Sequence, residues 1–441
     1  MGGDPRAALA QAPMSFAQIV VVALTIALNA LDGFDVLSIS FASPGIAAEW
    51  GIDRAALGVV LSMELFGMAA GSVLLGRLTD RIGRRPVILL CLCVMAFGMF
   101  MVPTTTSLVS LSMWRVFTGL GIGGMLAATN ATVAEYANER SKHLCVALMA
   151  IGYPIGAVLG GIVTAQLLKQ GDWRDVFYFG GFVTVAFLPL IWFLLPETIP
   201  FLIHKQGPGA LEKVNRLLLR MGHAAVAALP VVDERKQSGL SDILRAPLLA
   251  TTLLVTLAYF AHIATFYFIL KWVPKIVVDM GYAPSAAAGV LVWANVGGAT
   301  GGAALGLLAT RMSLRPLIIF ALAGSVVMVS WFGRGQANLA QLSLVVASAG
   351  FFGNAAVVGL YAVFAQAFPT RVRATGTGFA IGVGRGGAAV SPVVAGLLFT
   401  AGFSLQAVAL VMAMGAAIAA IAILLLPAPA ARAGDRREQP A

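Results

Sequence analysis

The chain has 441 residues, of which 59% are hydrophobic and only 11% are charged, and its formal net charge is +10. Soluble globular proteins carry about 25% charged residues. The composition therefore excludes a soluble globular protein and indicates a protein that lies in a lipid bilayer. No nucleic-acid recognition module accompanies the basic charge, so nucleic acid is not expected as a partner.

Segments long enough to span a membrane follow one another along the whole chain. A spanning helix needs about 20 predominantly apolar residues. Breaks at charges, Pro and Gly predict twelve spans, at residues 19–41, 56–76, 87–103, 108–134, 142–168, 175–195, 247–270, 284–309, 314–332, 337–364, 375–400 and 404–426. The first span is too long and too polar for the apolar region of a signal peptide, so we expect it to be retained. These spans predict an all-α membrane protein.

The first span contains an acidic run, DGFD, from Asp32 to Asp35. Each carboxylate in hydrocarbon costs roughly 2.5 to 3.5 kcal/mol on the lenient insertion scale. The two aspartates share one helical face, and Asn29 extends the same polar stripe. Burial favours the protonated form of such a group and a nearby arginine favours its ionised form. We therefore expect Asp32 and Asp35 to couple protons to the function of the protein.

Two more charges fall at a similar depth in the first half of the chain, Glu64 in the second span and Arg115 in the fourth. A rise of 1.5 Å per residue places both near the level of the two aspartates. A buried arginine needs a counter-charge, so we expect Arg115 to pair with an aspartate of the first span. Arg115 is either a substrate contact or only a clamp between helices. Glu64 either couples protons or is wetted at an outer vestibule.

The chain contains a tandem repeat. The loop GRLTDRIGRRP, from Gly76 to Pro86, recurs as GLLATRMSLRP from Gly306 to Pro316. A nearly equal offset relates the two sets of residues that follow spans four and ten, Glu135, Arg140 and Lys142 with Gln366, Arg371 and Arg373. The repeat predicts two six-helix halves, residues 1–200 and 246–441, joined by a cytoplasmic linker at 201–245. Parallel halves of this kind are typical of transporters that bind substrate near the membrane midplane.

The distribution of basic residues predicts the orientation of the chain. Most Lys and Arg residues fall in the loops on one side of the predicted spans, together with both termini. Cytoplasmic loops carry such an excess, so both termini are expected in the cytoplasm and the protein in the cell inner membrane. The linker contains one amphipathic run, from Leu211 to Met221, which we expect to form a helix at the cytoplasmic surface.

The eleventh span contains a single cation, Arg385, close to the midplane and flanked by glycines that allow close approach. A guanidinium is suited to bidentate recognition of a carboxylate, although it could instead pair with an acid of its own protein. Other midspan polar or aromatic side chains either line a pocket for an aromatic ring or only pack, and His262 is also a candidate proton relay. They are Tyr259, His262, Tyr267, Trp293, Asn295 and Tyr361.

Three glycine runs, at residues 119–124, 297–302 and 382–387, are expected to be close-packing surfaces. The sequence contains no Walker motif, no dinucleotide-binding context and no Cys/His spacing for a metal. We therefore expect no cofactor, no metal and no enzymatic activity.

Several motifs carry a family resemblance. GRLTDRIGRRP resembles the loop signature of the major facilitator superfamily, and Arg115 with Gly119, Gly121 and Gly123 is similar to its fourth-helix motif. Gly152 to Gly161 resembles its fifth-helix motif, and LPET at the end of span six and FPTRVR before span eleven are further matches. Within that superfamily, DGFD, the GRGG that contains Arg385 and the WVP that ends span seven resemble the aromatic acid:proton symporters.

The resemblance implies proton-coupled uptake of a small aromatic carboxylate, such as a hydroxybenzoate or benzoate, by a monomer that works by alternating access. Alternatives are a symporter of another organic acid such as a sugar acid or muconate, a drug:proton antiporter, or a transporter-like sensor. The resemblance also implies a cytoplasmic gate in which Asp80 faces a helix N-terminus in the outward-open state, although the arginines could serve only topology. The gate comprises Asp80, Arg81, Arg84, Arg85, Glu135, Arg140, Arg371 and Arg373. Lys271, before Trp272, is an unusual charge for this family.

Overall fold

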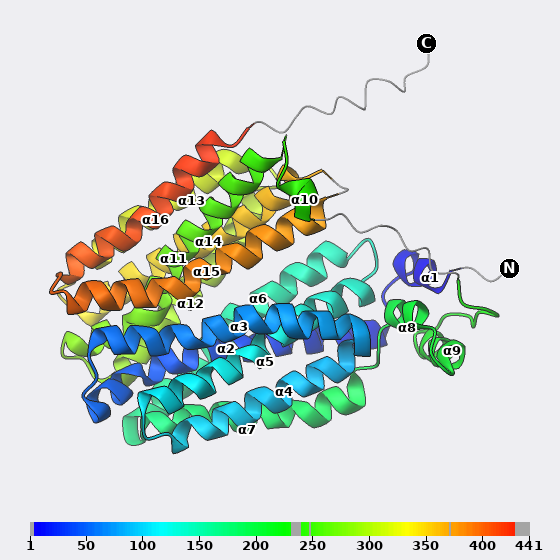
Figure 1. Ribbon diagram of the computed structural model, residues 1–441, viewed down its shortest axis with the longest axis horizontal. Helices are drawn as coiled ribbons and strands as arrows, with labels where there is room; N and C mark the ends of the chain where they lie inside the picture. Colours follow the sequence, from blue (N-terminus) through cyan, green and yellow to red (C-terminus); the bar gives the residue numbers. More distant parts are fainter. Residues whose placement is uncertain (1–3, 231–239, 247, 370–371, 428–441) are drawn as a thin grey trace, which may run out of the picture. The chain divides into compact units, whose positions relative to one another are not determined.

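A computed structural model describes residues 4–230, 240–246, 248–369 and 372–427, and every regular element among them is helical (Figure 1). The short helices are α1 (Pro5–Gln11), the 3-10 turn η1 (Val102–Thr104), α8 (Ile199–Lys205), α9 (Ala210–Arg220) and α10 (Leu240–Ile243). The long helices are α2 (Phe16–Trp50), α3 (Arg54–Ile82), α4 (Arg84–Met101), α5 (Leu108–Tyr136), α6 (Lys142–Gln170), α7 (Trp173–Leu194), α11 (Leu249–Asp279), α12 (Pro284–Leu308), α13 (Leu314–Phe332), α14 (Leu339–Ala367), α15 (Arg373–Thr400) and α16 (Leu405–Leu425).

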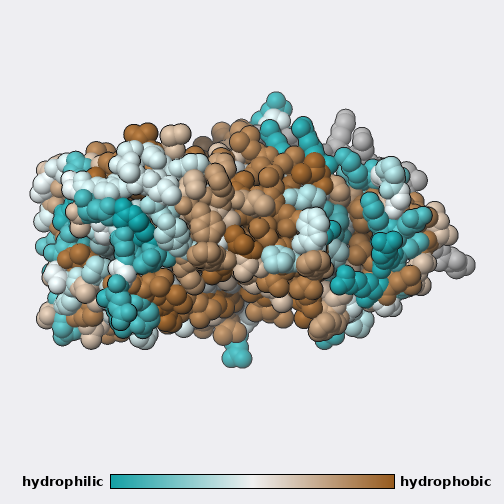
Figure 2. Space-filling view, turned by 90° about the horizontal axis from the view of Figure 1, so that it is seen from below, coloured by the Kyte–Doolittle hydropathy of each residue, from teal (hydrophilic) through white to brown (hydrophobic). Residues whose placement is uncertain are grey.

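Among the described residues, 12 helices are long and apolar enough to cross a membrane, which confirms the predicted all-α membrane protein. Several of them expose large apolar side chains; Phe193, for example, is 74% exposed. Figure 2 shows apolar residues over much of the face in view, with hydrophilic residues gathered toward its two ends. Water does not favour so much exposed apolar surface, whereas lipid does. The protein is therefore a multi-pass integral membrane protein.

Local signals fix where the helices begin and end. The capping box of α2 joins the Ser15 backbone N–H to Gln18 Oε1 at 2.8 Å and the Gln18 N–H to Ser15 Oγ at 3.4 Å. The same helix ends at Gly51, whose φ of 59° lies in the left-handed region. As a result α2 is longer at both ends than the predicted span at 19–41, and it carries the DGFD run in its interior.

The described residues form two compact units. Unit 1 contains the described residues within 1–235 and 270–296, and unit 2 contains those within 236–269 and 297–441. Helices α11 and α12 therefore each contribute one part to unit 1 and one part to unit 2. The predicted division into residues 1–200, 201–245 and 246–441 follows the repeat in the sequence rather than compactness, and it remains a prediction.

Glycines hold neighbouring helices close together within each unit. In unit 1, a Cβ at Gly119 or Gly123 of α5 would collide with the backbone carbonyls of Glu64 and Met68 in α3. In unit 2, Gly297 and Gly301 of α12 approach carbonyls of α14, and Gly387 of α15 approaches the carbonyl of Phe260 in α11. The three glycine runs are therefore close-packing surfaces, as predicted, and they fix which side chains of adjacent helices can meet.

The predicted amphipathic run in the linker is a helix, α9, which lies beside α8 in Figure 1. It buries Val214, Leu217 and Leu218 and exposes Lys213 and Arg216. The apolar stripe therefore packs on unit 1, and the basic residues lie on the outer face.

Candidate functional site

Four charged side chains in unit 1 form a buried charge cluster. Asp35 of α2, Glu64 of α3, Arg115 of α5 and Lys271 of α11 all have an exposed fraction of 0%. Lys271 belongs to the part of α11 that lies within unit 1. Unpaired charges are very unfavourable in such an environment, so the partners within the cluster determine what each group can do.

Glu64 is the acid that both cations contact. Its carboxylate forms an ion pair with Arg115 Nη2, and its Oε2 lies 3.6 Å from Lys271 Nζ. Each cation also donates a hydrogen bond to the α2 backbone: Arg115 Nη2 to the carbonyl of Asp35 at 3.1 Å, and Lys271 Nζ to the carbonyl of Val36. The two cations therefore connect Glu64 to α2.

The predicted partner of Arg115 was wrong: its carboxylate partner is Glu64, not an aspartate of α2. The reason is the glycine contact between α3 and α5, which brings Gly119 against the backbone of Glu64 and so places the glutamate within reach of Arg115. The prediction that Glu64 could be wetted at a vestibule was also wrong, because the side chain is fully buried.

Asp35 differs from Glu64 in its contacts. Among the described residues neither of its carboxylate oxygens has a hydrogen-bond partner, although Glu64 and Arg115 lie within electrostatic range. Protonation of Glu64 would remove the charge that holds two cations, whereas protonation of Asp35 breaks no ion pair. Asp35 is therefore the acid of the cluster that can exchange a proton with the least structural disturbance. Asp32 lies one turn away on α2 and is equally buried.

Lys271 is the member of the cluster to which sequence reasoning assigned no role. It is far from Glu64 along the chain, so no local spacing indicates that they meet. One signal could have found it: a single cation inside an apolar span requires a buried counter-charge. The predicted seventh span ended at residue 270 and so left Lys271 outside it, whereas α11 continues to Asp279 and the lysine is fully buried.

A second constellation, which we call the Arg385–tyrosine cluster, lies in unit 2. Arg385 of α15 is half-buried, interacts with the hydroxyl of Tyr259, and has Tyr361 and Tyr267 within electrostatic range. The hydroxyls of Tyr259 and Tyr361 lie 2.9 Å apart, and their ring centroids are 5.6 Å apart. In the part of the chain that the structure describes, no carboxylate forms an ion pair with Arg385.

A glycine again explains how this cluster forms. A Cβ at Gly384 would collide with the ring of Tyr259, so the glycine beside Arg385 allows the tyrosine of α11 to lie against α15. The result is a guanidinium bordered by hydroxyls and aromatic rings.

The remaining predicted lining residues have other contacts. His262 is buried, and its Nε2 lies 2.8 Å from the carbonyl of Gly353 in α14, so it joins α11 to α14. Asn295 donates to the carbonyl of Leu291 in its own helix at 2.9 Å, and Trp293 is 53% exposed. Trp293 and Asn295 belong to unit 1, whereas the Arg385–tyrosine cluster belongs to unit 2.

The first loop signature forms an ion-pair network. Arg84 pairs with Glu135 at 2.7 Å and with Asp80 at 3.4 Å, and the Asp80 side chain is 77% exposed. The N-terminus of α4 is occupied by Glu197, which accepts the backbone N–H groups of Arg84 and Arg85 at 2.9 and 3.2 Å. Burial raises the pKa of Glu197 in spite of these hydrogen bonds. Sequence reasoning had treated Glu197 only as part of a motif.

The other predicted gating residues are less closely connected. The Arg85 guanidinium lies 5.2 Å from the centroid of the Trp192 ring and donates to the Trp192 carbonyl at 2.5 Å. Arg81 and Arg140 are exposed, and Arg373 donates to the carbonyl of Phe368 at 3.4 Å. Arg371 lies outside the described residues.

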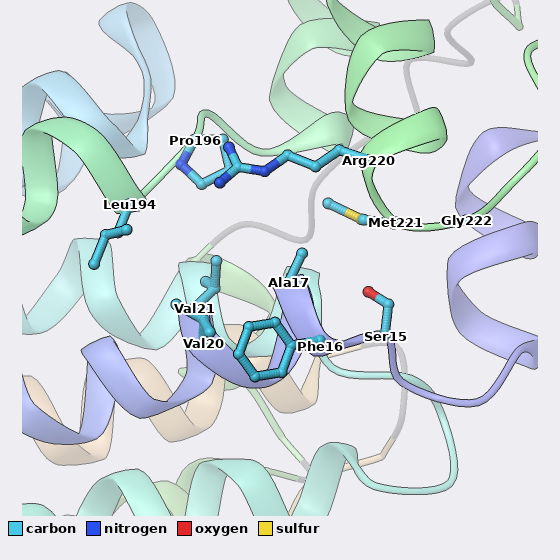
Figure 3. Close-up of a pocket in the computed structure, with 10 residues that line it drawn as sticks. All are labelled: Ser15, Phe16, Ala17, Val20, Val21, Leu194, Pro196, Arg220, Met221 and Gly222. Carbon is cyan, nitrogen blue, oxygen red and sulfur yellow. The ribbon is translucent and has the colours of Figure 1, made fainter.

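Figure 3 shows a pocket of about 440 Å³ in unit 1, at the junction of α2, the end of α7 and the end of α9. Its lining includes the apolar side chains of Phe16, Val20 and Leu194, and Arg220 extends across it toward Pro196 (Figure 3). The pocket includes none of the predicted site residues, so it is a separate surface feature.

Comparison with known proteins agrees with the architecture. The sequence profile of the Major Facilitator Superfamily matches residues 24–333. The chain is 30% identical over 417 residues to the gallate transporter of Pseudomonas putida, which covers 93% of this chain and 92% of that protein. It is also 30% identical over 433 residues to the 4-hydroxybenzoate transporter PcaK of Pseudomonas aeruginosa, which covers 96% and 95%.

The fold agrees as well. The xylose transporter XylE from E. coli, in an inward-open conformation, superposes with a TM-score of 0.73 at 15% sequence identity, covering 94% of this chain and 98% of that one. At that identity the likeness shows the fold alone. The profile match, the relatives and the fold together confirm the resemblance that the loop signature indicated: this chain belongs to the Major Facilitator Superfamily, a family of transporters rather than enzymes, with aromatic acid transporters among its relatives.

Proposed function

We propose that this protein is a secondary transporter that takes up a small aromatic carboxylate together with protons by alternating access. The substrate class is supported by the relatives, because gallate and 4-hydroxybenzoate are both hydroxylated aromatic carboxylates. The proposal also places the protein in the bacterial inner membrane as a monomer, with both termini in the cytoplasm, as the distribution of Lys and Arg favours.

The observation that carries the proposal is the Arg385–tyrosine cluster. Its guanidinium lies on a membrane-spanning helix and, among the described residues, has tyrosines rather than a carboxylate as partners. A planar guanidinium binds a carboxylate through two parallel hydrogen bonds, and aromatic rings pack against the ring of a substrate. Tyr259 and Tyr361 supply both rings and hydroxyls, so the cluster suits a hydroxylated benzoate.

Proton coupling is assigned to Asp35, with Asp32 as a second acid on the same helix. Asp35 is buried beside Arg115 and Glu64, and among the described residues it belongs to no ion pair of its own. A proton can therefore enter or leave this carboxyl while the Glu64 ion pairs stay in place. Changes in the distance to Arg115 during the transport cycle would then alter how tightly the proton is held.

The cytoplasmic gate is assigned to the network of Arg84 with Asp80, Glu135 and Glu197. These contacts join the end of α3, the start of α4, the end of α5 and the segment after α7. Breaking the network would release these helix ends together, which is the change that a gate requires.

Uptake of labelled 4-hydroxybenzoate into proteoliposomes tests the proposal. With an inward proton gradient we expect accumulation above the external concentration, and a protonophore should abolish it. The neutral amide of the same ring should equilibrate at most. Binding without any uptake would favour a sensor and contradict the proposal, and accumulation that is indifferent to the gradient would refute proton coupling.

A further inference from the structure

Lys271 is a fully buried lysine, and the acid that it contacts, Glu64, also forms an ion pair with Arg115. Its Nζ lies 3.6 Å from Glu64 Oε2, and Arg115 pairs with the same carboxylate. A single carboxylate compensates one cation. Glu64 therefore balances only one of the two positive charges of Arg115 and Lys271. The other positive charge must be balanced by another group.

The groups around the buried charge cluster can be named helix by helix from the described contacts. Helix α2 contributes Asp35, with Asp32 one turn away, and α5 contributes Arg115. Helix α4 contributes the uncharged sulfur of Met99, 3.6 Å from Arg115 Nη1, and the thiol of Cys91 within electrostatic range of Asp32. Helix α7 contributes the ring of Phe177, whose centroid is 5.4 Å from the Arg115 guanidinium. Asp35 is thus the cluster acid that can supply the missing negative charge.

The charge of the cluster then depends on Asp35 in a simple way. With Asp35 ionised, the charges of Asp35, Glu64, Arg115 and Lys271 sum to zero. With Asp35 protonated and Asp32 also uncharged, one positive charge is left over among side chains that are fully buried. A charge there is unfavourable, so an anion that enters at that moment is attracted.

We propose that Lys271 makes this cluster an electrostatic anion site: Glu64 is its internal counter-ion, and the extra positive charge selects an anionic substrate over a neutral one once Asp35 is protonated. The inference rests on the proposed function and deepens it, because it assigns specificity for the carboxylate to the buried charge cluster of unit 1 as well as to Arg385. Lys271 acts through net charge, and no direct contact between Lys271 and substrate is required.

The test compares binding of 4-hydroxybenzoate and of 4-hydroxybenzamide to the full-length protein in nanodiscs, at one acidic pH. Lys271→Gln should weaken binding of the acid by about tenfold, because it removes the excess charge, and should change amide binding by less than about twofold. Lys271→Arg keeps the charge and should bind both compounds as the parent does. Lys275→Gln is the matched control, since Lys275 lies one turn further along α11 and pairs with Asp279.

The double variant Glu64→Gln/Lys271→Gln shows whether Lys271 favours the acid through the net charge of the cluster or through direct contact with the substrate. It has the same net charge as the parent, so acid binding should recover to within about threefold of the parent value. Recovery would support the proposal. Removing Glu64 restores the net charge but cannot restore a contact between the lysine side chain and the substrate.

Three outcomes would overturn the inference. The Lys271→Gln variant could bind the acid as tightly as the parent, it could lose acid and amide binding equally, or the double variant could fail to recover although its thermal stability is normal. A parent protein that binds the amide but not the acid would refute the proposed function itself, and the inference with it. Parent binding of the acid with no effect of Lys271→Gln would refute only the inference.

Discussion

The two clusters of this protein handle buried charge in opposite ways. In the buried charge cluster of unit 1, Arg115 and Lys271 share Glu64 and Asp35 lies within electrostatic range, so two acids compensate two cations when both acids are ionised. In the Arg385–tyrosine cluster of unit 2, the cation has neutral hydroxyls as its neighbours among the described residues. A compensated cluster is suited to storing a proton, whereas an uncompensated cation is suited to binding an anion from outside.

The largest change in stability should come from removing the negative charge of Glu64 in the buried charge cluster of unit 1. Glu64→Gln leaves Arg115 and Lys271 without their shared carboxylate, and we expect a loss of about 3 to 5 kcal/mol in the free energy of unfolding. The measurement is thermal unfolding of the purified protein by fluorescence. Arg385→Gln is the matched comparison, and it should change stability much less because it leaves no ionised partner buried. Equal destabilisation by the two variants would remove the distinction between the clusters.

A smaller effect should come from changing the geometry of the cation in unit 2 while keeping its charge. Arg385→Lys loses the planar fork, so the affinity for 4-hydroxybenzoate should fall by about tenfold at normal expression. The measurement is equilibrium binding, with 4-hydroxybenzamide as the control ligand. If acid and amide lose affinity equally, Arg385 is a structural charge and the substrate assignment rests on the relatives alone.

Removal of the exposed acid in the loop network should affect stability only slightly. Asp80 is largely exposed and Arg84 keeps Glu135 as a partner, so Asp80→Asn should cost less than about 1 kcal/mol. If the network is a gate, transport should nevertheless fall and a cysteine probe on the outer side should become less accessible. Unchanged transport and accessibility would assign Asp80 to topology only.

The smallest effect concerns Glu197 and pH. Its pKa is raised in the folded protein, so the folded state binds more protons than the unfolded state between the ordinary glutamate pKa and the raised one. The free energy of unfolding should therefore fall modestly as pH rises through that interval. Glu197→Gln should remove this slope, as thermal midpoints measured from pH 4 to pH 7 would show. A slope that is unchanged in the variant would assign it to another group.

The sequence predicted more of the fold than of the site, for physical reasons. Twelve spans follow from local hydropathy, and the depths of Asp35, Glu64 and Arg115 follow from counting residues. The ion pairs of Glu64 with Arg115 and Lys271 could not be predicted in this way. They depend on how closely α3 approaches α5 and on Lys271, which belongs to α11, far along the chain. Tyr259 and Tyr361 were identified singly, but that their hydroxyls meet beside Arg385 depends on the packing of α11, α14 and α15.

The central claim is that Asp35 couples protons while Arg385 binds the substrate. Its most direct test is a single variant that separates proton coupling from substrate movement. Asp35→Asn should lose accumulation driven by a proton gradient, while exchange of labelled for unlabelled 4-hydroxybenzoate across the proteoliposome membrane continues at a rate close to that of the parent. That result would place the proton on the unit 1 cluster and leave substrate binding intact at Arg385. Full gradient-driven accumulation by Asp35→Asn, or by the double variant with Asp32→Asn, would contradict the account.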